Sequence, residues 1–208
     1  MQYVEPSRHR VDLRGGQLLA ASGSYEKKLK DLEGLYADTA AFAAAAESHG
    51  EDIVYRVTDR KPESAHGDLI FGVTRMEPGR IGDEFYMTRG HIHARANRPE
   101  TYYGESGEGL MLLESPEGET RIVEIAERIV CYVPPFWIHR SINIGDSPLV
   151  MSFCYPADAG QDYDVIHRSG GMKSRILAEG SGWREVPNAD YRPRGPGDIA
   201  AILATADQ

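Results

Sequence analysis

Short, strand-like segments that follow one another from residue 52 to residue 155 constrain the fold of this chain more than any other feature. β-Branched and aromatic residues recur in them with a period of two, and turn signals such as Pro78-Gly79 and Pro116-Glu117-Gly118 separate them. The segments comprise residues 53–57, 69–76, 84–88, 101–103, 109–114, 120–125, 129–133 and 149–155. Short strands with no helices between them predict an all-β fold, an antiparallel barrel or jelly roll with a few peripheral helices.

The two ends of the chain carry the helical signals. Asp38 is a good N-cap for the Ala-rich residues 39–48, and Gly50 permits a left-handed cap behind them. Residues 198–204 predict a short capped helix near the C-terminus. The segment 25–32 is compatible with a helix start or with a charged connector.

The length of 208 residues favours one domain. We expect it to comprise an N-terminal arm and helix (1–50), the barrel with its functional site (51–170) and a C-terminal strand or tail (171–208).

The charge balance narrows the function. The 23 Lys and Arg residues against 32 Asp and Glu residues leave a formal net charge of −9, which argues against a general nucleic-acid binder and a polybasic membrane-surface protein. A small anionic substrate is compatible with this charge where a metal or an arginine reverses the local field. Because no signal-peptide pattern and no bilayer-length apolar run are present, we expect a cytoplasmic protein. Cys131 and Cys154 lie in apolar segments and are expected to be small buried residues.

Two segments carry residues with metal-binding chemistry, and the first holds three of the candidate ligands. His91 and His93 are two residues apart, which places both imidazoles on one face of a strand. Residues 94–99 favour a loop, after which Glu100 can return at the head of the next strand with Tyr102 on the same face.

The second segment supplies a third histidine. Pro134 and Pro135 end the preceding strand, and His139 lies early in the strand that follows. In an antiparallel barrel this strand can lie beside the first pair of histidines. Three neutral imidazoles and one carboxylate suit a divalent first-row metal with open positions for a substrate, with Fe(II), Mn(II), Ni(II) and Zn(II) as candidates.

Each of these residues also has a purely structural interpretation. Paired histidines occur on solvated strand faces, a lone Glu at a strand start is typical of a surface charge, and His139 can be a hydrogen-bonded structural residue. Their combination on a strand-rich chain favours the metal site. The other histidines lack such a context and are expected on the surface: His9, His49, His66 and His167.

The two segments resemble the two motifs of the cupins. The first reads His91-x-His93, then Glu100 and Gly107, and the second reads Pro134-x-Phe136-x-x-His139-x-x-x-Asn143, with Phe136 in place of the usual Gly. The loop between His93 and Glu100 is longer than in most cupins. It points to a branch, the cupin-type glucose-6-phosphate isomerases, to which the chain is similar over residues 30–170, including segments 71–74, 88–94, 107–113, 132–140 and 155–160.

This resemblance implies a cupin barrel, a homodimer and the interconversion of glucose 6-phosphate and fructose 6-phosphate. It implies one divalent metal ion per subunit, Fe(II) first, held by His91, His93, Glu100 and His139. The implied phosphate ligands are Thr74, Thr88 and Gly90, and the implied lining of the sugar pocket is Tyr55, Tyr102 and Tyr155. Glu100, Tyr102 and Tyr155 are the candidate catalytic residues. Gln161 stands where the family often has a histidine that is a candidate for ring opening.

Five arginines fall near these segments, and we expect ordinary surface charges among them: Arg75, Arg89, Arg95, Arg98 and Arg140. Arg89 and Arg95 are second-rank candidates for phosphate binding.

The reaction leaves two mechanisms open. Glu100 can act as a base that moves a proton between carbons 1 and 2 through an enediolate, or it can be a ligand only, beside a direct hydride shift. Two other functions have the same candidate ligands. One is a metal-dependent cupin oxygenase or decarboxylase, and the other is a non-catalytic phosphosugar-binding cupin.

Overall fold

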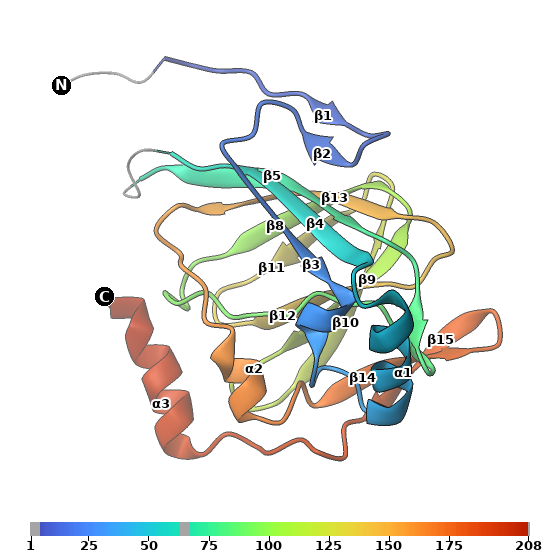
Figure 1. Cartoon of the computed structure of the whole chain (residues 1–208). Helices are drawn as coiled ribbons and strands as arrows, with labels where there is room; N and C mark the ends of the chain where they lie inside the picture. Colours follow the sequence, from blue (N-terminus) through green and yellow to red (C-terminus); the bar gives the residue numbers. More distant parts are fainter. Residues whose placement is uncertain (1–4, 63–66, 208) are drawn as a thin grey trace.

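The computed structural model describes residues 5–62 and 67–207 and confirms the predicted mainly-β class (Figure 1). Its largest sheet has six strands in the order β11-β8-β13-β5-β4-β3, and every neighbouring pair is antiparallel. The bounds are β3 Gly23–Lys28, β4 Ile53–Arg60, β5 Leu69–Met76, β8 Glu100–Ser106, β11 Val130–Val133 and β13 Leu149–Pro156.

A second antiparallel sheet of three strands completes the barrel. Its order is β10-β9-β12, with bounds β9 Glu108–Glu114, β10 Thr120–Ala126 and β12 Ile138–Asn143. Buried side chains from both sheets, such as Met76, Leu112 and Met151, belong to one hydrophobic cluster. The apolar residues 110–113 are all buried because β9 is the central strand.

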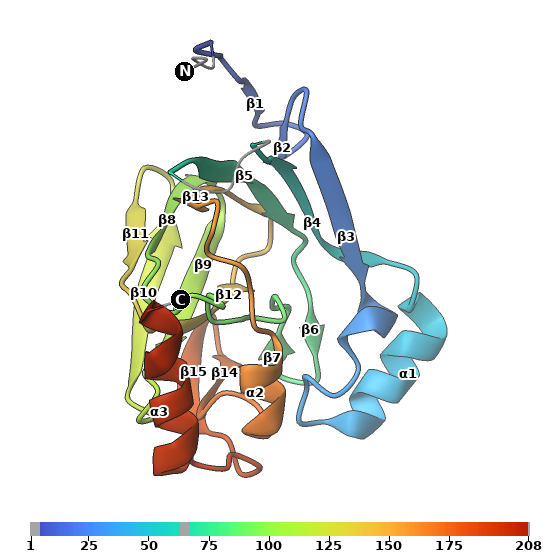
Figure 2. The same ribbon diagram turned by 90° about the vertical axis from the view of Figure 1, so that its left-hand side faces the viewer.

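Smaller elements surround the barrel (Figures 1 and 2). A two-stranded sheet joins β1 Val11–Asp12 and β2 Gln17–Leu18, and a four-stranded sheet contains β6 Arg80–Ile81, β7 Glu84–Phe85, β14 Ser174–Glu179 and β15 Gly182–Pro187. The helices are α1 Thr39–His49, α2 Asp164–Arg168 and α3 Pro196–Ala204, with 3-10 turns at Leu29–Leu32 and Thr205–Asp207. None of the described helices is both long enough and apolar enough to cross a bilayer.

The structure corrects the sequence-based elements in three places. Gly50 has φ −57° and continues the right-handed helix, so the predicted left-handed cap is wrong. Residues 25–32 form neither of the two predicted alternatives: β3 pairs with β4 through Lys28, and a 3-10 turn follows. The predicted strand 84–88 ends at Phe85, and Met87 makes only an isolated bridge.

The C-terminal segment is attached to the barrel through a buried ion pair. Nη1 of Arg194 lies 2.7 Å from Oε1 of Glu114, the last residue of β9, and the two side chains are 4% and 0% exposed. Figure 2 shows the result, with α3 beside α2 on the outside of the molecule. The proposed division at residues 50 and 170 stays a prediction.

Candidate metal centre

Backbone pairing brings the four candidate ligands together. Glu100 begins β8 and His139 is the second residue of β12. His91 exchanges two backbone hydrogen bonds with His139, of 3.0 and 2.9 Å. The sequence predicts a strand for His91 and His93, but in the structure this segment forms only isolated bridges, at His91 and Ile92. Both imidazoles still converge on Glu100.

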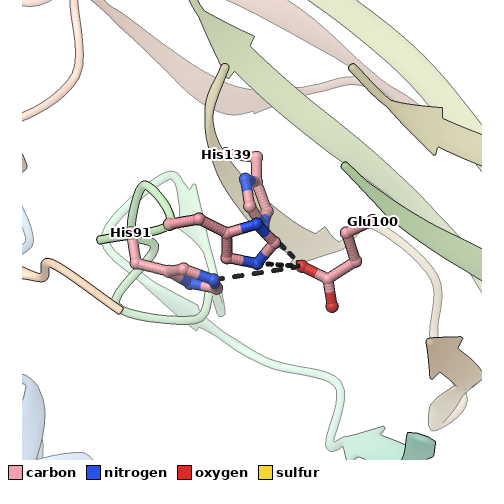
Figure 3. A group of neighbouring side chains, drawn as sticks. His91, Glu100 and His139 are labelled. Atoms are coloured by element: carbon pink, nitrogen blue, oxygen red, sulfur yellow. Dashed lines mark hydrogen bonds and ion pairs between the residues drawn. The ribbon is translucent and has the colours of Figure 1, made fainter. Parts of the chain in front are cut away.

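The donor atoms form a compact, buried group (Figure 3). Oε2 of Glu100 lies 3.0 Å from Nε2 of His139, 3.3 Å from Nε2 of His93 and 3.9 Å from Nε2 of His91. One ligand atom from each of the four residues lies within 4.8 Å of all the others. Each side chain is buried, so bulk water does not compete strongly for these donors.

Backbone carbonyl groups orient two of the imidazoles. Nδ1 of His93 is 2.7 Å from the Arg98 carbonyl oxygen, and Nδ1 of His139 is 3.1 Å from that of Trp137. With Nδ1–H donating to a carbonyl, the neutral ring keeps its lone pair on Nε2, which faces Glu100. The backbone therefore presets the tautomer that a metal needs.

Electrostatics keep Glu100 ionised and His91 neutral. Burial raises the pKa of the Glu100 carboxyl group, but its interactions with His139 and His93 outweigh burial and hold this pKa well below its usual range. Burial, with His139 nearby, lowers the pKa of His91 well below 6.5. A carboxylate and neutral imidazoles are the protonation states that bind metal ions.

The residues fit a divalent first-row metal ion. Nε2 of His93 is buried and has no hydrogen-bond partner, although Glu100 is close. Such an orphaned lone pair is costly in a protein interior unless something binds it. Three imidazole nitrogens and one carboxylate match the preferences of Fe(II), Mn(II), Ni(II) and Zn(II).

A cavity opens beside this group, and every residue expected at the phosphate and sugar lies in its wall, apart from the second-rank arginines. These residues are Tyr55, Thr74, Thr88, Gly90, Tyr102 and Tyr155, and His91, Glu100 and His139 line the same cavity. Burial raises the pKa of Tyr55 to about 12, and the pKa values of Tyr102 and Tyr155 also lie above their ordinary value. The three hydroxyl groups are therefore protonated at neutral pH and able to donate.

Several residues of the cavity wall were not predicted from the sequence. Val57, Asp59 and Ser141 follow Tyr55 and His139 at intervals of two, so strand periodicity was a signal that could have found them. Lys61 continues the series from Tyr55, and Phe153 precedes Tyr155 by two residues on β13, so the same periodicity applies to them. Tyr25 and Tyr163 come from other segments without any such signal.

The arginines occupy different places. Arg95 lies outside the cavity wall, and its Nη1 is 2.6 Å from Asp158. The guanidinium of Arg89 stacks 4.9 Å from the ring centroid of Tyr163. Arg140 is no ordinary surface charge, because it is only 5% exposed.

Gln161 also lies in the cavity wall, beside a ligand. Its Nε2 is 3.4 Å from Nε2 of His91, and its Oε1 accepts a hydrogen bond from the Tyr163 hydroxyl. Among the other histidines, His49 and His167 are exposed and His9 is half-buried against Phe71, while His66 lies outside the described residues.

Fold and site together define a class: a small β-barrel protein with a buried three-histidine, one-carboxylate centre at the wall of a polar cavity. Residues 26–194 match the family described as glucose-6-phosphate isomerase (GPI). The chain is 58% identical over 199 residues to the glucose-6-phosphate isomerase of Sinorhizobium medicae, covering 95% of this chain and 93% of that protein. It is 41% identical over 182 residues to the glucose-6-phosphate isomerase of Thermococcus litoralis, covering 88% and 94%.

The chain therefore belongs to the glucose-6-phosphate isomerase family, and the resemblance found in the sequence is confirmed. Similar solved structures include the oxalate decarboxylase of Bacillus subtilis, 26% identical with a TM-score of 0.44 over 52% of this chain and 27% of that one. Another is an oxalate oxidase, 14% identical with a TM-score of 0.45 over 53% and 55% of the two chains.

Proposed function

We propose that this chain interconverts glucose 6-phosphate and fructose 6-phosphate as a metal-dependent aldose–ketose isomerase. One observation carries the proposal: in a chain of this family, His91, His93, Glu100 and His139 present their donor atoms within 4.8 Å of one another at a cavity lined by tyrosines and threonines. The cavity offers hydroxyl donors to a sugar and the cluster offers ligands to a cation.

These four residues would hold one divalent metal ion per subunit, with Fe(II) as our first candidate and Mn(II), Ni(II) and Zn(II) as the others. When bound, the ion supplies Lewis-acid stabilisation of the negative charge that develops on the sugar oxygens. The orphaned Nε2 of His93 supports this assignment.

We assign the proton transfer to Glu100. Its carboxylate is ionised and buried beside the cavity, so it can take a proton from one of carbons 1 and 2 of the open-chain sugar and return it to the other. We assign Tyr102 and Tyr155, whose raised pKa values keep them protonated, as donors to sugar oxygens. Label from C2-deuterated glucose 6-phosphate that is partly lost to water would support this route, whereas complete retention in fructose 6-phosphate would favour a hydride shift.

The phosphate group is assigned to Thr74, Thr88 and Gly90, which line the cavity together. Their hydroxyl and amide groups are neutral donors suited to phosphate oxygens. Arg89 stays a second-rank candidate through its position over Tyr163. We leave Arg95 out of the phosphate site because it lies outside the cavity wall and its Nη1 donates to Asp158.

We further propose a cytoplasmic homodimer. The edge strand β11 supports a second copy as partner, because Val130 and Tyr132 are 62% and 55% exposed on it. Sedimentation velocity would report about twice the chain mass of 23.0 kDa for a dimer. A species of single-chain mass at micromolar concentration would contradict this part of the proposal.

Conversion of fructose 6-phosphate, coupled to an NADP-linked dehydrogenase, tests the reaction on the protein as purified, after chelation and after each metal is added back. We expect activity to disappear on chelation and to return with at least one metal. Glu100→Gln should lower turnover about 100-fold or more, the usual contribution of a general base. The exposed Glu124 of β10 offers the matched control Glu124→Gln, which should keep full turnover.

Absence of turnover with every metal, on folded and metal-loaded protein, would overturn the isomerase. Oxygen consumption or carbon dioxide release would then indicate the oxygenase or decarboxylase alternative. Sugar-phosphate binding without any turnover would indicate a binding protein.

A further inference from the structure

Arg140 is a buried cation without a counter-ion beside it. It lies on β12 between His139 and Ser141, which both line the cavity, so its own side chain projects from the opposite face of the strand. Only 5% of Arg140 is exposed, and no carboxylate lies within 4.0 Å of its guanidinium in the part of the chain that the structure describes. A desolvated arginine normally has such a partner.

Arg140 makes its hydrogen bonds to residues 87–90, the segment that contains the proposed phosphate ligands Thr88 and Gly90. Nη2 donates to the carbonyl oxygen of Arg89 over 2.7 Å, and Nη1 lies 3.2 Å from the sulfur of Met87. Nε is buried and has no partner. The strongest contact of the guanidinium is therefore with the peptide that joins Arg89 to Gly90.

This peptide connects Arg140 to the cavity. The described backbone has no cis peptide bonds, so the carbonyl of Arg89 and the N–H of Gly90 point in opposite directions within one plane. The carbonyl points to Arg140, which directs the N–H away from it. Gly90 lines the cavity, and its N–H donates to no acceptor among residues 5–62 and 67–207.

Two neighbouring features fit an anion at this position. The φ of Gly90 is +72°, and a Cβ atom would meet the carbonyl oxygen of His139 at 2.9 Å, so glycine is needed for this orientation of the peptide. The Thr88 hydroxyl oxygen accepts a hydrogen bond from the Ser141 N–H over 3.1 Å. The hydroxyl proton of Thr88 thus remains free to donate.

We infer that Arg140 is a positioning residue for the phosphate group of the substrate: it orients and polarises the Arg89–Gly90 peptide as a hydrogen-bond donor and places a fixed positive charge behind it. The assignment rests on the proposed function, because the ligand is the phosphate of that substrate. A dianion should gain more from this charge than a monoanion, since the attraction scales with ligand charge. Arg140 would therefore favour phosphate esters over sulfate esters.

The first test measures the binding of inorganic phosphate to metal-free protein by calorimetry at pH 8, where phosphate is a dianion. Arg140→Met removes the charge beside Met87, and we expect the dissociation constant to rise about 10-fold or more, as for loss of a charge-assisted hydrogen-bond contact. Arg140→Lys keeps the charge, so its dissociation constant for phosphate should lie between those of the unaltered protein and Arg140→Met. Arg56→Met is the matched control, because the side chain of Arg56 is 42% exposed and pairs with Glu26 on β3.

A second readout uses the unaltered protein. Phosphate should shift the amide resonance of Gly90 downfield in a titration followed by NMR, so the test does not depend on Arg140→Met folding. In the loaded enzyme, Arg140→Met should raise KM far more than it lowers kcat, with metal content unchanged. Glucose 6-sulfate, used as a competitive ligand, should lose less affinity than glucose 6-phosphate.

Unchanged phosphate affinity in folded Arg140→Met, or a Gly90 amide that does not respond to phosphate, would overturn the inference. Failure of the proposed reaction would be seen separately, as absence of turnover in the unaltered, metal-loaded enzyme. The binding measurements on metal-free protein stand in either case.

Discussion

Individual side chains at the metal centre depend on the backbone behind them. His93 and His139 each use Nδ1 on a carbonyl oxygen, which leaves Nε2 for a cation. Gly90 likewise adopts a left-handed conformation so that its peptide faces the cavity. Both features are local, and both can be tested by single substitutions.

His139→Ala should abolish metal binding and activity together, because it removes one of four donors and leaves the Glu100 carboxylate without its closest partner. The expected result is background metal by elemental analysis and background turnover in the coupled assay. His167→Ala, at an exposed position of α2, is the control and should keep both. Stoichiometric metal in His139→Ala would remove this residue from the ligand set.

Gly90→Ala should destabilise the protein more than Gly180→Ala. Both glycines have positive φ, +72° and +59°, so each substitution costs roughly 1–2 kcal/mol of backbone strain. A Cβ at Gly90 would also meet Ile166 Cδ1 at 2.7 Å, whereas nothing lies within 4 Å of one at Gly180. Urea unfolding of the two variants gives the comparison, and equal losses would show that the loop yields to the added methyl group.

Among the elements, β12 carries two functions on its two faces. His139 and Ser141 line the cavity, while Arg140 lies behind the sheet with the 87–90 segment. The alternation of a strand makes this division possible, since neighbouring side chains point to opposite faces. The C-terminal tail contributes differently, through Arg194 on the end of β9.

Arg194→Met should cost about 3–5 kcal/mol of the free energy of unfolding, because it leaves the Glu114 carboxylate charged and buried. Among the residues that the structure describes, Glu114 then keeps only its bonds from the Lys173 amide and the Tyr191 hydroxyl. The exposed Arg192 provides a control: Arg192→Met should change the free energy of unfolding by less than ~0.5 kcal/mol. A loss this small in Arg194→Met would show that the tail contributes little to stability.

The barrel as a whole buries the metal-binding residues, and this burial makes the free energy of unfolding of the metal-free protein depend on pH. The folded protein holds the pKa of His91 well below 6.5, mainly through burial. The unfolded chain therefore binds a proton below pH ~6.5 that the folded chain does not, so the free energy of unfolding falls as pH falls, by up to ~1.4 kcal/mol per pH unit. The lowered pKa of Glu100 acts in the same direction below its ordinary pKa.

Urea unfolding of chelated protein between pH 7.5 and 5 measures this dependence. His91→Gln should flatten it, and His49→Gln, at an exposed position, should leave it unchanged. An unchanged slope in His91→Gln would mean that the ring is already charged or exposed in the folded protein.

The local sequence determined the positions of several strands, the candidate metal ligands and the family of this protein. Strands β5, β9, β10 and β13 lie within one residue of the predicted ranges because each is a short segment rich in apolar residues between strong turn signals. The ligand set was also readable, because His91, His93 and Glu100 lie close together in sequence and His139 follows a Pro-Pro turn. The enzyme family followed from long matching segments.

Tertiary structure alone decided the rest. Strands β1, β2 and β6 have two residues each and take their conformation from their partners, so they carry no periodic signal. Tyr25 reaches the cavity because β3 pairs with β4, and Arg140 is buried because the 87–90 segment covers it. Such positions depend on contacts between residues that are far apart in sequence. These contacts are stabilised by burial and strand pairing across the fold, and they leave no periodic pattern in the local sequence.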